Sequence, residues 1–156
     1  MTKILLSLHV LAAIIAIGPV TVAASMFPPA VRRVAHGGEG AGAAALSTVR
    51  LLHGICRVYA GIGVAVPVLG LATALAMGVL GSGWLVTSIA LTTAAAGILV
   101  AFVLPRQGEL LEELAAGQPV EHGRTVQLAM LTGVFNLLWA VVTVLMIVRP
   151  GSTTGA

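Results

Sequence analysis

The sequence predicts an all-α membrane protein, a single bundle of four transmembrane helices with both termini on the outer side. Of its 156 residues, 58% are hydrophobic and 8% are charged, whereas a soluble domain carries about 25% charged residues. Four apolar stretches each have about the 20 residues that are needed to cross the hydrocarbon core of a bilayer. Arginine and lysine gather on one side of these stretches, which is the usual signature of membrane topology.

The four predicted spans contain no Asp, Glu, Lys or Arg, and they cover residues 4–26, 58–80, 84–104 and 126–148. Lipid offers no hydrogen-bond partners, so each span is expected to pair its own backbone groups as a helix. A cleavable signal peptide is the alternative for the first span. Signal peptides, however, have apolar regions of about 7–15 residues, shorter than this one. The chain length fits one domain at 1–150, followed by a tail at 151–156.

The long first connection contains helix breakers. Pro28, Pro29 and the glycines at 37–40 are expected to end the first helix. A helical pattern resumes at about Ala43, so we expect the second helix to begin before the bilayer. His36 is expected to be solvated beside this glycine-rich segment.

The later connections are shorter or more polar. Residues 81–83, Gly-Ser-Gly, predict a tight turn. Residues 108–117 predict a short amphipathic helix bounded by glycines, and His122 beyond it is expected to be solvated. Pro67, in the middle of the second span, lacks a backbone N–H and predicts a kink.

The basic residues set the predicted orientation. Six of them flank the first and third connections: Arg32, Arg33, Arg50, Arg57, Arg106 and Arg124. The opposite side holds Lys3 and Arg149. Because short cytoplasmic loops are rich in Lys and Arg, this bias places both long connections in the cytoplasm and both termini outside. The net charge of +3 is therefore explained by topology, and no nucleic-acid partner is expected.

His9 is the one ionisable side chain well inside a predicted span. An ionisable group in the membrane is expensive to bury and is a functional candidate by default. Its imidazole could ligate haem iron, bind copper or zinc, or relay a proton. The alternative is a neutral ring that is hydrogen-bonded across to a hydroxyl in the outer half of the bundle, namely Thr87, Ser88 or Thr143.

His53 and Cys56 lie three residues apart and therefore share a helix face. With Met26 and Met130 at a similar inner depth, they could form a soft metal site suited to copper(I). Neighbouring arginines disfavour a cation there and would better suit an anionic lipid headgroup. The chain has one cysteine, which excludes an internal disulfide.

Small and polar residues in the spans predict helix packing. Gly70, close to Pro67, is among the small residues that let helix backbones approach. Asn136 lies in the middle of the fourth span, where an unpaired amide is costly, so it should face another helix.

Known catalytic patterns are missing from the sequence. It contains no nucleotide-binding loop, no Gly-x-Ser-x-Gly and no His-Glu-x-x-His. No span carries a carboxylate, which argues against a proton-coupled multidrug antiporter. We therefore expect a protein that is not an enzyme.

The first span opens with His9-Val10-Leu11, followed by Gly18. This element resembles the opening of an uncharacterised bacterial family of predicted integral membrane proteins (domain of unknown function 2269). Residues 67–71 are similar to the second helix of that family, and residues 145–150 to its usual close. The resemblance implies a four-helix protein of the bacterial cytoplasmic membrane, without an established activity.

The same element resembles the four-helix membrane domain of CopD-type copper-resistance proteins. Members of that group usually carry a Trp before the glycine, where this chain has Ile17. From residues and resemblance together, the first expectation is a structural or accessory subunit of a larger membrane complex, with lipid and other membrane chains as partners. The alternatives are a haem- or copper-binding membrane protein centred on His9, and a small transporter or lipid-handling protein.

Overall fold

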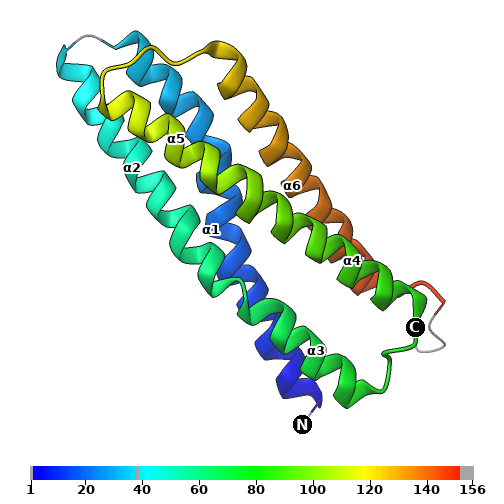
Figure 1. Cartoon of the computed structure of the whole chain (residues 1–156). Helices are drawn as coiled ribbons and strands as arrows, with labels where there is room; N and C mark the ends of the chain where they lie inside the picture. The colour runs from blue at the N-terminus through cyan, green and yellow to red at the C-terminus, as the bar shows by residue number, and fades with distance from the viewer. Residues whose placement is uncertain (1, 38, 152–156) are drawn as a thin grey trace.

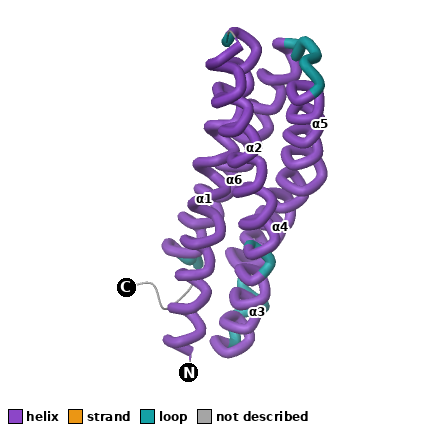
Figure 2. The backbone as a smooth tube through the Cα atoms, turned by 90° about the vertical axis from the view of Figure 1, so that its left-hand side faces the viewer, coloured by secondary structure: helices purple, strands orange, loops and turns teal. Residues whose placement is uncertain are grey.

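A computed structural model of the chain describes residues 2–37 and 39–151. This part of the chain is helical throughout apart from short connections, and it contains no strand (Figure 2). The helices in chain order are α1 (Thr2–His36), α2 (Glu39–Ile62), α3 (Ala65–Met77), α4 (Gly83–Ile98), the π-helical segment η1 (Leu99–Val103), α5 (Leu104–Ala115) and α6 (His122–Val148).

These elements form four long rods. Thr2–His36, Gly42–Met77, Gly83–Ala115 and His122–Val148 are each long and apolar enough to cross a membrane. The prediction of an all-α four-helix transmembrane bundle is confirmed, and the chain is a multi-pass membrane protein.

The rods run up and down (Figure 1). The beginning of α1, the connection from α3 to α4 and the end of α6 lie at one end of the bundle, which we call the terminal end. The opposite end, which we call the loop end, holds the α1–α2 and α5–α6 connections. Both described ends of the chain therefore share a side, while the outward orientation of that side stays a prediction.

The main hydrophobic core lies toward the loop end, where α1 packs on α2 and α6, and α5 packs on α2. Its large buried side chains come from all four rods: Phe27, Val49, Leu52, Leu110, Leu128 and Phe135. Large apolar side chains also cover the outside of the bundle, for example Ile14 at 64% and Ile147 at 75% exposed. A belt of this kind suits hydrocarbon and not water.

The expected end of the first helix at Pro28 and Pro29 is wrong. Helix α1 continues through both prolines to His36. Each proline removes one backbone hydrogen bond, which normally bends or breaks a helix. Here Phe27, Pro28 and Val31 are all buried against neighbouring helices, so packing holds the turn that the missing bonds would weaken.

The amphipathic helix expected at 108–117 is present within α5, but its expected start is wrong. Gly108 lies inside α5, which follows η1 and α4 without interruption and ends at Ala115. Leu110 and Leu114 are buried in the core, and this packing carries the helix through the glycine. Only Gly117, with a left-handed φ of 69°, takes part in ending the rod.

The second rod is broken, and the break precedes Pro67. Helix α2 ends at Ile62 and α3 begins at Ala65. Pro67 therefore lies in the first turn of α3, where a missing N–H would have had no helical partner. The second helix also starts at Glu39, four residues before the expected position. The predicted turn at 81–83 is longer, because α3 ends at Met77 and α4 begins at Gly83. Most of the predicted tail, 152–156, lies outside the described residues.

Candidate functional site

His9 lies between α1 and α3 and is 8% exposed. Its Nδ1 is 2.9 Å from the backbone oxygen of Val66. A carbonyl oxygen can only accept, so Nδ1 carries the proton. On the neutral ring Nε2 is then the acceptor, and it is the ring nitrogen left for a metal.

Gly70 lies beneath the His9 ring. A Cβ added at Gly70 would stand 2.8 Å from Cε1 of the imidazole, closer than real contacts allow. The glycine thus provides the space that lets the imidazole reach the Val66 carbonyl one turn earlier on α3.

The expected hydroxyl partners of His9 are wrong. Thr87, Ser88 and Thr143 each donate to a carbonyl four residues earlier in their own helix, at 2.8–2.9 Å. His9 instead faces α3, because α1 packs along α3 throughout the terminal half of the bundle. The hypothesis of a cofactor at His9 stays a prediction.

His53 and Cys56 meet a third residue, Gln107 of α5. Nδ1 of His53 donates to Oε1 of Gln107 at 3.3 Å, and Nε2 of Gln107 lies 3.7 Å from Sγ of Cys56. Gln107 and Cys56 are both fully buried. The amide therefore joins α2 to α5 through two weak polar contacts inside an otherwise apolar seam.

The predicted soft metal site acquires no further ligand from the expected methionines. Met26 is 49% and Met130 is 66% exposed, so both side chains lie largely on the surface of the bundle. Among the described residues, no group of three or more His, Cys, Asp or Glu side chains gathers closely enough to hold a metal ion. Metal binding at His53 and Cys56 stays a prediction.

Asn136 joins α6 to α1. Its Nδ2 donates to the hydroxyl of Ser25 at 3.1 Å. Its Oδ1 is buried and has no partner among the described residues, as is also true of Oγ1 of Thr132 and Nε1 of Trp139. These three residues follow one another at spacings of four and three on α6, so they share a face. Trp139 also packs edge to face on Phe135, with ring centroids 6.3 Å apart.

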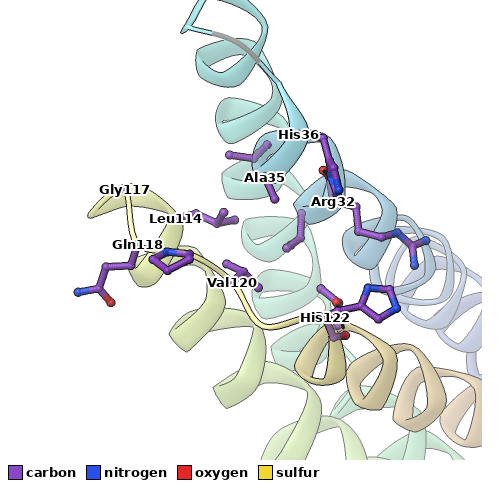
Figure 3. A pocket seen from close by; sticks show the side chains of 12 residues that line it. Arg32, Ala35, His36, Leu114, Gly117, Gln118, Val120 and His122 are labelled. Carbon is purple, nitrogen blue, oxygen red and sulfur yellow. Dashed lines mark hydrogen bonds between the residues drawn. The ribbon is translucent and has the colours of Figure 1, made fainter.

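A cleft of about 540 Å³ opens at the loop end (Figure 3). Its floor contains three buried residues, Val31, Leu114 and Thr125. Three exposed basic or imidazole side chains come from the last turn of α1 and the start of α6: Arg32, His36 and His122. The cleft thus combines one arginine and two imidazoles at its edge with a largely apolar floor.

Local bonds fix the edge of this cleft. Nδ1 of His36 lies 2.6 Å from the carbonyl oxygen of Arg32, and the hydroxyl of Thr125 donates to the carbonyl oxygen of His122 at 2.7 Å. A second hollow, lined by the acidic residues of α5, shares Gln118 with the cleft. The α5–α6 connection thus separates a basic surface from an acidic one.

Neither of these two clefts is lined by Thr73, Thr92, Thr132 or Asn136, the residues that a transporter of this chain would be expected to use. Sequence reasoning missed both Gln107 and the loop-end cleft. Gln107 lies beyond the third predicted span, 84–104, in the connection to the fourth. His36 and His122 are exposed as expected, but they end and begin helices.

No protein-family model, curated protein or solved structure matches this chain. The two family resemblances drawn from the first span therefore stay predictions.

Proposed function

We propose that this chain is a structural or accessory subunit of a larger membrane complex. The observation that carries the proposal is a row of small side chains on the outside of the third rod. Thr93, Gly97 and Ala101 follow one another at four-residue spacing, and all three are exposed. In lipid, small residues at this spacing are typical of surfaces where a second helix approaches closely.

Packing inside this chain does not explain the row. A Cβ added at Gly97 would meet nothing within 4 Å. Gly18 on α1 and Gly61 on α2 are also exposed, and a Cβ added at either position would likewise meet nothing within 4 Å. Large aliphatic side chains cover the rest of the surface, where they contact lipid. The exposed small residues are therefore better explained by contact with helices of another chain.

The test is isolation of the tagged full-length chain from its own membranes in a mild detergent, followed by identification of co-purifying chains. We expect at least one other membrane protein in stoichiometric amount. Gly97→Leu should release it, because the leucine fills the space that the partner helix would occupy.

Val134→Leu on α6 is the control. Val134 is already a large aliphatic side chain, 42% exposed, so enlarging it should leave the partner bound. A homogeneous wild-type chain without any partner, by co-purification or by crosslinking in intact membranes, would refute the proposal.

A further inference from the structure

The loop-end cleft brings an arginine and two imidazoles from two helices to one concave surface. Its volume of about 540 Å³ lies within the range of about 300–1,000 Å³ that is usual for small-molecule sites. Arg32 and His36 come from the last turn of α1 and His122 from the start of α6, and all three are exposed. In the view of Figure 3 the side chains of Arg32 and His122 extend to the same side of the cleft.

The charge around this cleft is positive. None of the described residues that line it is Asp or Glu. Glu109 and Glu113 of α5 line the separate acidic hollow, and both pair with Arg124. The guanidinium of Arg32 has no hydrogen bond, ion pair or ring contact within residues 2–37 and 39–151. It is therefore available to an anion from outside the chain.

The cleft begins where the apolar stretches of the chain end. Thr125, on its floor, directly precedes the fourth stretch, 126–148. His122 lies about 6 Å beyond the start of that stretch, and Arg32 about 9 Å beyond the end of the first, 4–26, at 1.5 Å per residue. The headgroup layer on each side of the hydrocarbon core is about 5–7 Å thick. Both side chains are therefore within reach of lipid phosphates.

The helix face that continues from His122 into the membrane is apolar. His122, Val126 and Met130 follow one another at four-residue spacing on α6, so they share a face. Val126 is 45% and Met130 is 66% exposed. An occupant that fits both the basic edge and this face carries an anionic group joined to a long apolar chain, which is the chemistry of a phospholipid.

We propose that the loop-end cleft binds the headgroup of an anionic phospholipid, with one acyl chain along Val126 and Met130. The planar guanidinium of Arg32 matches a phosphate group through two parallel hydrogen bonds, and the imidazole of His122 donates a further one. This site is separate from the row at Gly97, so the lipid site and the proposed subunit role can fail independently.

The lining favours an anionic headgroup over a zwitterionic one. A choline or ethanolamine group would bring a positive charge beside Arg32 and would find no carboxylate among the described residues that line the cleft. Basic pockets at the cytoplasmic ends of membrane helices are a usual means of binding anionic lipids. The predicted cytoplasmic position of the loop end agrees with this choice of leaflet.

The test is native mass spectrometry of the delipidated full-length chain in detergent. The chain is titrated with phosphatidylglycerol and, separately, with phosphatidylcholine of the same acyl chains. We expect the first phosphatidylglycerol to bind several-fold more tightly. Arg32→Ala should weaken its binding by about tenfold or more, the usual effect of losing a hydrogen bond to a charged group. His122→Ala, on a different helix, should weaken it by a smaller factor.

Arg33→Ala is the matched control, because it removes the same charge one residue away. Arg33 is exposed but does not line the cleft, so this variant should keep the affinity of the wild type. Equal losses in the two arginine variants would show a general attraction to a basic surface and would overturn the site. Equal affinities of the wild type for the two lipids would overturn it as well.

A second arm distinguishes a lipid from a soluble anion. Glycerol phosphate and inorganic phosphate, which lack acyl chains, should displace phosphatidylglycerol only at much higher concentrations. Displacement at similar concentrations would show that the cleft binds a soluble phosphate, and the lipid proposal would fail. Helix content and monodispersity in detergent report whether each variant folds, and His122→Ala tests the same site if Arg32→Ala does not.

Discussion

The imidazole of His9 occupies the space that a side chain at Gly70 would fill, with Cε1 only 2.8 Å from the position of an added Cβ. The two residues come from α1 and α3, and together they lock these helices at the terminal end. His9, which the sequence marks as a cofactor candidate, thus also makes a structural contact between α1 and α3. The contact between His9 and Gly70, the polar contacts of Gln107 and the buried, unpartnered polar groups on α6 each lead to a testable prediction.

Gly70→Ala should destabilise the bundle by about 1–3 kcal/mol, the usual cost of overpacking a closely packed site. The methyl group would force the His9 ring away from the Val66 carbonyl. The measurement is reversible unfolding in detergent micelles. Gly97→Ala is the control and should be neutral or slightly stabilising, since nothing lies within 4 Å of its Cβ. Equal effects of the two changes would contradict the contact.

Thr132→Val should stabilise the protein by about 1 kcal/mol, because it removes a buried hydroxyl without a partner at nearly constant volume. The matched change is Thr73→Val, where the hydroxyl donates to the Leu69 carbonyl at 2.7 Å. That variant should be neutral or destabilised. Both residues are buried, at 2% and 5% exposed, so the same unfolding assay compares them directly. A destabilised Thr132→Val would show that the hydroxyl has a partner in the membrane, such as a bound water.

Gln107→Ala should cost about 2–4 kcal/mol, since it leaves a cavity and two polar groups without partners. Gln107→Leu keeps most of the volume and should cost less. The rate at which a maleimide labels the Cys56 thiol tests the same packing between α2 and α5. Labelling should be slow in the folded wild-type protein, where Cys56 is fully buried, and faster in Gln107→Ala. Rapid labelling of the wild type would contradict this packing.

Reporter fusions test the orientation. Enzymes that are active only outside the cytoplasm should be active at both termini, and inactive when inserted at 116–121. The physical reason is the excess of arginine at the loop end. Activity at one terminus alone would contradict the shared side of the termini in the structure, whereas activity only at 116–121 would reverse the bundle.

The spans could be predicted from sequence because hydrocarbon demands about 20 apolar residues per crossing. The ends of the helices could not be predicted in this way, because the tendency of proline and glycine to end a helix applies to a helix without packed neighbours. Pro28, Pro29 and Gly108 all lie within helices whose neighbours bury the adjacent side chains. Likewise, the chemistry of His9 marked it as a candidate, yet its partner depended on which helix packs beside α1.

The sequence by itself determined that lipid surrounds the chain, that it crosses the membrane four times and that the crossings are helical. These properties follow because apolar side chains prefer hydrocarbon to water and because each crossing must pair its own backbone hydrogen-bonding groups. Only the tertiary structure decided that His9 meets Gly70 and that Gln107 reaches His53 and Cys56. Those relationships depend on how separate helices are rotated and set in register against one another. Packing between distant segments fixes rotation and register, and the hydropathy of any one segment does not encode them.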